Sequence, residues 1–497
     1  MNRRKFLLAG GASLAVPALN AIPRANASQS AAGGNHLKTP HRPNVVVIIC
    51  DDLGYGDLGC YGSKLSTPNL DRLAANGVLL RSHVTPTPVC SASRAALLTG
   101  LYPTRINTPR VFFPPTTDGM TLGTETLANV LHGAGYRSMA IGKWHLGHTK
   151  PYLPLSRGFD EYFGVPYSVD MQPLPLIQDM KIVAREADRS QLTQQYTKQA
   201  VEFIDRAKDK PFFLYMAHSY PHIPLFASKE FRGKSPLGLY GDVVHEIDWS
   251  VGKVVDAIRH NGLEENTLVI FTSDHGPWFQ GSTGNLRGRK GTTCEGGVRI
   301  PMVASLPGVL PANQTRDALS SHLDMLPTIA HLCGAGMPER PVDGNDMWKM
   351  LSGQEQEVER DHAILHFSEW NLQCARWQQW KLHVARPNVP QYLPRPAEGK
   401  VVYRLRHPEL YHVIDDPKES YDVAAKYPEI VARIQQSIQA QLATMPDRVK
   451  EAHSATMQHV TNPWMPAGSY AESSDDLKPI SAAANAQAWA TFKDLGS

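Results

Sequence analysis

The feature that most constrains the fold of this 497-residue chain is a set of four uninterrupted apolar runs. The first, Asn44–Cys50, reads Asn-Val-Val-Val-Ile-Ile-Cys, and the others cover residues 138–141, 212–217 and 267–272. A strand with one face in water alternates apolar and polar residues, whereas a strand covered on both faces is apolar throughout. The four runs therefore predict central strands of a sheet that is buried between two layers.

Segments with helical spacing of apolar residues separate these runs. They cover residues 70–76, 126–132, 191–209 and 240–260. Most of them end at or just before a glycine, which commonly terminates a helix. The alternation of strands and helices predicts an α/β fold, with a large, mixed and mostly parallel sheet between helices.

The chain changes character near residues 355–362, where several charged residues indicate a surface connection. Beyond it, residues 362–384 and 401–413 are typical of short, aromatic-rich strands, and residues 428–445 are typical of a helix. We therefore predict a main domain, a smaller C-terminal subdomain with an antiparallel sheet and a helix, and a tail without a clear pattern: residues 44–360, 361–450 and 451–497.

The first 27 residues are typical of an export signal. Arg3 and Arg4 resemble a twin-arginine pair, an apolar run continues to about Leu19, and the small residues 25–27 suit cleavage. This run is too short for a transmembrane helix, which needs about 20 residues. We expect an exported, periplasmic protein with a flexible lead-in over residues 28–43. An ordinary export signal and an uncleaved anchor are the alternatives.

Net charge and cysteine spacing exclude several kinds of function. The formal net charge is +3, and the signal segment carries four basic residues and no acidic one, so the mature chain is close to neutral. A nucleic-acid partner or an anionic membrane surface is therefore not expected. The six cysteines are scattered without a Cys-x-x-Cys pair, which argues against a disulfide framework or a structural zinc site. A single disulfide formed after export is the alternative.

A short stretch around Cys90 is the strongest candidate for chemistry. Pro86 and Pro88 hold the approach extended, and residues 91–99 read as a helix. Cys90 would then lie at a helix N-terminus, which favours an anion, with Arg94 one turn away on the same face. A sulfur nucleophile beside a fixed guanidinium suits an oxyanion. A small buried cysteine at a loop-to-helix joint is the alternative interpretation.

The stretch reads Cys-x-Ala-x-Arg followed by Leu-Leu-Thr-Gly-Leu-Tyr-Pro-Thr-Arg, and it resembles the signature of type I sulfatases of the alkaline-phosphatase superfamily. The resemblance implies that a maturation enzyme oxidises Cys90 to formylglycine, whose hydrated aldehyde is the nucleophile. Ala92 stands where proline is commoner, which leaves open which maturation enzyme acts. The likeness covers about residues 44–445 and includes a C-terminal signature at residues 409–424.

Polar residues follow the first and fourth apolar runs, at the sheet edge where open α/β folds bind ligands. Asp51 and Asp52 follow the first run, and Asp274 and His275 follow the fourth. Adjacent carboxylates at a buried strand end repel each other unless a cation lies between them. Together with one oxygen of the modified Cys90, they predict a site for Ca²⁺, with Mg²⁺ as the alternative. A simple turn or helix cap is the other interpretation.

The resemblance implies roles for further residues. Sulfatases commonly carry asparagine where His275 stands, so this histidine either completes the metal site or hydrogen-bonds the substrate. Lys143 and His145, in Gly-Lys-Trp-His-Leu-Gly, would bind sulfate and act as a base, respectively. His222 would donate a proton to the leaving oxygen, and Lys290 would be a second sulfate-binding lysine.

Ser168 would hydrogen-bond the sulfate region, again by resemblance. For the substrate, the sequence leaves two interpretations of the loop at residues 167–175 and of Gln391 and Tyr392, which either line the entrance or form ordinary surface. Three tryptophans of the predicted C-terminal strands are expected to pack in the core: Trp370, Trp377 and Trp380.

These expectations amount to an exported sulfuric ester hydrolase that acts on an aryl or carbohydrate sulfate. Two alternatives remain at this point. A phosphonate or phosphate ester hydrolase of the same superfamily would use a similar tetrahedral anion, metal and basic residues. A carbohydrate-binding protein without activity would keep Cys90 unmodified.

Overall fold

The computed structural model describes residues 42–388, 401–458, 482–492, 494 and 495. The export signal, nearly all of the lead-in, Gln391 and Tyr392 lie outside the described residues, so the expectations for them stay predictions. No helix in the described part of the chain is both long and apolar enough to cross a membrane.

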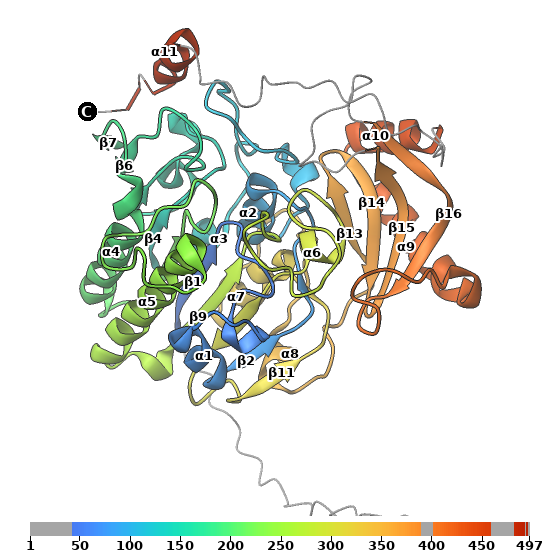
Figure 1. Cartoon of the computed structure of the whole chain (residues 1–497), viewed down its shortest axis with the longest axis horizontal. Coiled ribbons are helices and arrows are strands. Elements are labelled where there is room, and N and C mark those ends of the chain that lie inside the picture. Colours follow the sequence, from blue (N-terminus) through green and yellow to red (C-terminus); the bar gives the residue numbers. More distant parts are fainter. Residues whose placement is uncertain (1–41, 389–400, 459–481, 493, 496–497) are drawn as a thin grey trace, which may run out of the picture. The chain divides into compact units, whose positions relative to one another are not determined.

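A ten-stranded mixed sheet forms the centre of the fold (Figure 1). Its strands are β1 (Asn44–Cys50), β2 (Val78–Leu80), β4 (Arg137–Gly142), β5 (Glu161–Gly164), β6 (Leu176–Gln178), β7 (Lys181–Ala184), β8 (Phe212–Ala217), β9 (Thr267–Ser273), β10 (Met302–Ser305) and β11 (Gln314–Arg316). They are arranged in the order β11-β2-β10-β9-β1-β8-β4-β5-β6-β7. The neighbours β9, β1, β8 and β4 are parallel to one another, while β10 runs antiparallel to β9.

The four apolar runs are these four adjacent parallel strands, as predicted. Every residue of β1, β8 and β9 is buried, because the sheet is covered on both faces. Val47 of β1 pairs with Tyr215 of β8 and with Ile270 of β9. Since the strands are parallel and in register, their carboxyl ends meet at one edge of the sheet.

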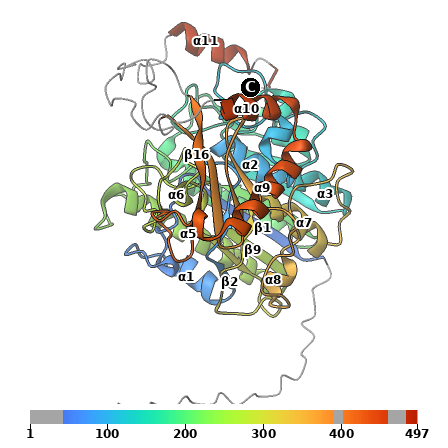
Figure 2. The same ribbon diagram turned by 90° about the vertical axis from the view of Figure 1, so that its right-hand side faces the viewer.

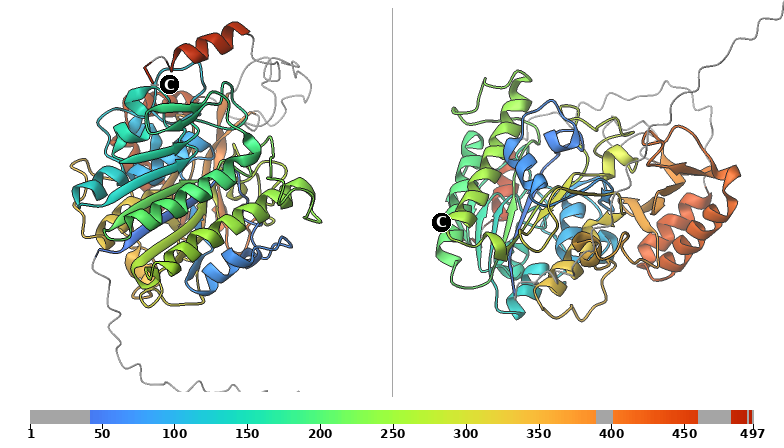
Figure 3. Two further views of the ribbon diagram at one scale, coloured as in Figure 1. Left: turned by 90° about the vertical axis from the view of Figure 1, so that its left-hand side faces the viewer. Right: turned by 90° about the horizontal axis from the view of Figure 1, so that it is seen from below.

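Helices cover both faces of the sheet (Figure 3). One face carries α1 (Pro68–Ala75), α4 (Leu192–Ala207) and α5 (Gly238–His260), and the other carries α2 (Cys90–Thr99), α3 (Leu127–Gly133) and α7 (Met325–Leu332). In α4 the buried residues recur at helical spacing: Tyr196, Ala200, Phe203, Ile204 and Ala207. The predicted helices are thus present, with ends that differ by a few residues.

A separate four-stranded antiparallel sheet follows, as predicted. It consists of β13 (Ile364–Ser368), β14 (Asn371–Trp377), β15 (Trp380–Pro387) and β16 (Val402–His412). The helices α9 (Pro428–Ala443) and α10 (Asp447–Gln458) pack beside this sheet (Figure 2). Ile434, Ile438 and Leu442 of α9 are buried in its apolar core. Trp370, Trp377 and Trp380 are partly buried and pack against this core.

The remaining elements are short. They are the strand pair β3 (His83–Val84) and β12 (Ser320–Ser321), and the helices α6 (Glu295–Val298), α8 (Trp348–Ser352) and α11 (Ala482–Ala490). The sequence had predicted neither α10 nor α11 within the tail.

Candidate active site

The site residues continue directly from the central strands. The backbone N–H of Asp274 donates to the carbonyl of Cys50, and that of Lys143 donates to the carbonyl of Ala217, so the hydrogen-bond ladder extends into them. Asp52 follows with a φ of 65°, a left-handed conformation that is uncommon outside glycine. The ends of the central strands therefore determine where the backbone of the site lies.

Three buried carboxylates each meet a cationic side chain at this edge. Lys143 Nζ donates to Asp51 Oδ2 at 2.6 Å, and Lys290 Nζ donates to Asp52 Oδ1 at 2.8 Å. Arg94 Nη2 donates to Asp274 Oδ2 at 3.0 Å. Burial alone would raise the pKa of Asp51, but the charges of Lys143, His222 and Arg94 hold it well below its usual range. Burial raises the pKa of Asp274, although His275 and Arg94 oppose this.

Cys90 lies among these carboxylates. It is the first residue of α2, it is 2% exposed, and its Sγ is 3.3 Å from His275 Nε2. One set of metal-ligand atoms, from Asp51, Cys90, Asp274 and His275, lies within 4.8 Å of one another, and so does a second set from Asp52, Cys90 and His222. Cys90 belongs to both sets, so the predicted nucleophile and metal site share one location.

The donors at this location fit a hard divalent cation. Three carboxylates supply several oxygens within a small volume, which is the donor chemistry of Ca²⁺ or Mg²⁺. Asp51 Oδ1 is buried and accepts no hydrogen bond from the described residues; Arg94 Nη2 lies 3.5 Å from it. A buried carboxylate oxygen without a donor is costly unless a cation binds it.

His275 points its Nε2 atom into the carboxylate cluster. That atom lies 3.5 Å from Asp52 Oδ1 and 3.6 Å from Asp274 Oδ1, while Nδ1 is 2.9 Å from the carbonyl of Gly276. A proton on Nδ1 would be donated to that carbonyl, which leaves Nε2 facing the carboxylates. Burial alone would lower the pKa of His275, but the charges of Asp274, Cys90 and Asp52 raise it to about 9.

His145 is held as a neutral imidazole beside the cluster. Its backbone is left-handed, with a φ of 62°, and its Nε2 lies 3.0 Å from the carbonyl of Phe112. Nδ1 is buried and has no partner among the residues that the structure describes. Burial and the positive charges of Lys143 and Arg94 hold the pKa of His145 well below its usual range. Nδ1 is therefore free to accept a proton.

His222 and Ser168 complete the set of predicted residues. His222 Nε2 is 3.7 Å from Asp52 Oδ2, which places it beside Cys90 and Lys290. Ser168 is buried, and its Oγ makes no hydrogen bond within the described ranges. Its loop is tied to the site because the backbone N–H of His145 donates to the carbonyl of Pro166, although the Ser168 side chain makes no hydrogen bond to Cys90.

A buried ionic cluster, not predicted from the sequence, connects the Lys290 loop to the C-terminal sheet. Glu295 accepts from Arg376 Nη1 at 2.6 Å and from Lys381 Nζ at 3.0 Å. Lys381 Nζ also lies 3.1 Å from Glu419, which in turn pairs with His383. We call these five residues the Glu295 cluster. The only local signal for it was the glutamate that precedes Gly296 and Gly297.

Close backbone packing explains the glycines of this loop. A Cβ atom on Gly297 would lie 1.9 Å from the carbonyl oxygen of Thr292, and one on Gly276 would lie 1.9 Å from that of Gly296. Any side chain at either position would displace backbone. The loop that carries Lys290 is therefore packed tightly against the strand end that carries Asp274 and His275.

Comparisons with known proteins agree with this site. The family described as "Sulfatase" matches residues 43–335, and the "C-terminal region of aryl-sulfatase" matches residues 359–474. Human N-acetylgalactosamine-6-sulfatase is 35% identical over 450 residues, which cover 80% of this chain and 85% of that protein. Human arylsulfatase A is 35% identical over 447 residues, which cover 80% of this chain and 88% of that protein.

Solved structures agree as well. PsFucS1 sulfatase from Pseudoalteromonas sp. superposes with a TM-score of 0.74 and 29% identity over 82% of this chain and 91% of that one. Ps i-CgsB, solved in complex with k-i-k-neocarrahexaose, superposes with a TM-score of 0.70 and 31% identity over 81% of this chain and 92% of that one. The chain therefore belongs to the sulfatase family of the alkaline-phosphatase superfamily and is a sulfuric ester hydrolase.

Proposed function

We propose that the protein hydrolyses the sulfate monoester of a saccharide through a formylglycine made from Cys90, beside a divalent cation. The observation that carries this proposal is the convergence at Cys90 of three carboxylates, two lysines and two histidines from separate strand ends. Most of these residues follow β1, β4, β8 and β9, which are neighbouring parallel strands. Open α/β folds bind ligands at the carboxyl ends of such strands.

The proposed cation site comprises Asp51, Asp52, Asp274 and His275, with Ca²⁺ as the favoured ion because oxygen donors predominate. A bound cation would offset the charge of the carboxylates and of the sulfate group. His275 supports this assignment through the direction of its Nε2 atom, which faces the carboxylates. We therefore favour the metal-ligand role of His275 over a contact with the substrate; a cation that binds Nε2 would displace the proton that the carboxylates otherwise hold there.

The chain's own cations would bind the sulfate group. Each lysine ammonium has three donors, so Lys143 and Lys290 can keep their carboxylate partners and still donate to sulfate oxygens. Arg94 is held by Asp274 and by the carbonyl of Lys143, to which its Nη1 donates at 3.0 Å. It thus fixes the position of Lys143 while adding positive charge. Fixed donors in a buried site stabilise a developing negative charge by several kcal/mol.

Two histidines would move protons. The Sγ atom of Cys90 marks the position of the hydroxyl oxygens of the hydrated aldehyde, which supplies one hydroxyl to take the sulfuryl group and a second to release it as inorganic sulfate. His145 would accept a proton from a hydroxyl at this position, because its Nδ1 is unprotonated and without a partner among the described residues. His222 would donate to the leaving oxygen, since its Nε2 lies on the Lys290 side of Cys90.

Export and substrate class belong to the same proposal. The twin-arginine-like segment supports an exported, periplasmic protein whose Cys90 is modified by a maturation enzyme before export. A sulfated saccharide is favoured over an aryl sulfate because one relative is an N-acetylgalactosamine-6-sulfatase and one structural neighbour was solved with a carrageenan-type hexasaccharide.

The test compares wild type and Cys90→Ala on 4-nitrophenyl sulfate, 4-nitrophenyl phosphate and a 4-nitrophenyl phosphonate. Formylglycine would lower the intact mass by about 18 Da relative to the thiol. We expect that mass, sulfate release by wild type and none by the variant. An unmodified thiol in protein from the native host, or faster hydrolysis of the phosphorus esters, would favour the binding-protein or the phosphonate and phosphate hydrolase alternative, respectively.

A further inference from the structure

Two aromatic residues stand at the rim of the site, directly after the strand end that supplies Asp274 and His275. Phe279 is 55% exposed and Trp278 is half-buried. Their ring centroids are 5.1 Å apart with an interplanar angle of 87°, so the two rings form a step. An exposed aromatic side chain beside a polar site is a common mark of a binding surface.

The step adjoins the side of the site that is open to solvent. Lys290 Nζ lies 6.0 Å from the centre of the Trp278 ring, and the backbone N–H of Lys290 donates to the carbonyl of Pro277. The Lys290 side chain is 16% exposed, whereas that of Lys143 is fully buried. A substrate whose sulfate group contacts both lysines must therefore extend outward past Lys290, toward Trp278 and Phe279.

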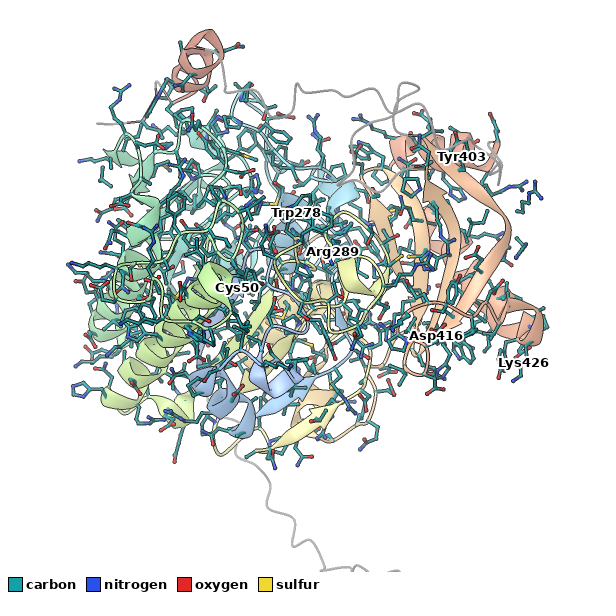
Figure 4. All side chains as sticks on the ribbon, viewed as in Figure 1. Cys50, Trp278, Arg289, Tyr403, Asp416 and Lys426 are labelled. Carbon is teal, nitrogen blue, oxygen red and sulfur yellow. The ribbon has the colours of Figure 1, made fainter. Side chains whose placement is uncertain are left out.

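Arg289 adds a positive charge to this rim. Its guanidinium carbon lies 4.6 Å from the centre of the Phe279 ring, and its Nη1 donates to the carbonyl of Trp278 at 2.9 Å. Figure 4 labels Arg289 and Trp278 near the centre of the view. No carboxylate in the described part of the chain forms an ion pair with Arg289. A guanidinium has five N–H donors in a planar fork, so most of them remain available to a carboxylate or sulfate.

We propose that Trp278, Phe279 and Arg289 form a subsite for the saccharide unit next to the one that loses sulfate, and that this neighbouring unit is anionic. The apolar C–H face of a pyranose ring packs on the aromatic step, while its carboxylate or sulfate binds Arg289. The inference rests on the proposed function and adds to it the substrate class, an acidic oligosaccharide in place of a sulfated monosaccharide.

Exposure alone does not single out this step, because Tyr421 is 75% exposed. An arginine stacked on an aromatic ring is also not unusual here, since the guanidinium carbon of Arg433 lies 4.4 Å from the centre of the Trp377 ring in the C-terminal subdomain. What distinguishes this group is its position next to Lys290: the Trp278 ring lies beside Lys290 Nζ, and Phe279 and Arg289 contact Trp278. Tyr421 and Arg433 therefore serve as matched controls.

The test measures kcat/KM for sulfated tetrasaccharides of chondroitin 6-sulfate, heparan sulfate and ι-carrageenan, for the corresponding sulfated monosaccharides, and for 4-nitrophenyl sulfate. We expect Phe279→Ala and Arg289→Gln each to lower the ratio of tetrasaccharide to monosaccharide kcat/KM about tenfold, the loss of a single good contact. Tyr421→Ala and Arg433→Gln should leave that ratio unchanged.

Other results would overturn the subsite, the substrate class or the proposed function. An unchanged ratio in both rim variants, or an equal fall in the control variants, would overturn the subsite. Hydrolysis of 4-nitrophenyl sulfate without hydrolysis of any tetrasaccharide would overturn the substrate class while the sulfatase mechanism stands. Protein that carries formylglycine and hydrolyses no sulfate ester would overturn the proposed function and this inference with it.

Discussion

Glu295 and Lys381 form a buried ion pair, with 3.0 Å between Nζ and Oε1, that joins the loop of Lys290 to the C-terminal antiparallel sheet. Both side chains are fully buried, and 86 residues of sequence separate them. The C-terminal sheet thus contacts the loop of a proposed sulfate-binding residue through charge as well as through packing.

Breaking this pair should lower the stability of the fold. Lys381→Met keeps the length of the side chain but leaves Glu295 and Glu419 with fewer cations in a buried setting. We expect a loss of about 3–5 kcal/mol in the free energy of unfolding, measured by urea denaturation. Lys349→Met, which removes an exposed pair with Glu355, is the control and should cost far less stability, because an exposed ion pair is screened by solvent. Equal losses in the two variants would contradict a structural role of the cluster.

The Glu295 cluster also predicts how stability depends on pH. Burial would raise the pKa of Glu295, but Arg376, Lys381 and Arg299 lower it to about 2, against about 4.3 in the unfolded chain. A lowered carboxyl pKa contributes stability above the unfolded value, and that stability is lost as the pH falls toward 2. The difference in unfolding free energy between wild type and Glu295→Gln should therefore be constant from pH 7 to about 5 and shrink below it.

Glu355→Gln is the control for this measurement, because Glu355 is an exposed glutamate in an ion pair. Its difference from wild type should stay small at every pH. Protonation of a buried neutral histidine such as His83 also destabilises the folded state in acid. His83 does not interact with Glu295, and it is present in all three proteins, so its contribution cancels in the differences. A wild-type advantage over Glu295→Gln that grows in acid would contradict the assignment.

The role of His145 can be separated from its contribution to folding. His145→Asn suits the left-handed backbone, since asparagine tolerates a positive φ, but asparagine cannot accept the proton. We expect kcat for 4-nitrophenyl sulfate to fall about 10²–10³-fold with little change in thermal stability. His148→Asn is the matched control, because His148 is buried in the same loop and contacts Thr491 instead. A similar fall in kcat for both variants would argue against a base at His145.

Removal of the metal should be visible without an activity assay. After chelation, we expect a lower Tm that Ca²⁺ restores at lower concentration than Mg²⁺, because the carboxylates favour a bound cation. Asp51→Asn and Asp274→Asn should bind no metal by elemental analysis. Asp57→Asn is the control, since Asp57 is a buried neighbour bonded to Tyr240 and to the backbone of Gly54 and Ser282. Metal content that stays unchanged in Asp51→Asn would refute the site.

The central strands of the fold could be predicted directly from the apolar runs of the sequence. The bounds of β1 and β8 agree with the apolar runs because strands covered on both faces carry a continuous apolar sequence. The outer strands β7 and β11 were missed, since both are short and neither contains a buried residue, so neither forms a long apolar run in the sequence. These strands form because they pair with strands that are distant in sequence, and the local sequence pattern does not reveal such pairing.

Some features of the candidate site could likewise be predicted from the sequence, and others could not. Strand ends of a parallel sheet must meet, so the proximity of Asp51, Lys143 and Asp274 could be predicted from where the apolar runs stop. The choice of partner, such as Lys143 with Asp51 and Lys290 with Asp52, depends on side-chain directions that sequence does not encode locally. The Glu295 cluster and the Trp278–Phe279 step were missed for that reason.

The burial of Cys90 determines when its proposed conversion to formylglycine could take place. A thiol that is 2% exposed at the start of a helix, among charged side chains, is out of reach of the active site of another protein once the chain has folded. The proposed oxidation would therefore have to take place on the nascent or unfolded polypeptide. Protein that folds before the maturation enzyme acts would be well ordered but inactive, and Cys90 would become accessible to that enzyme again only after unfolding.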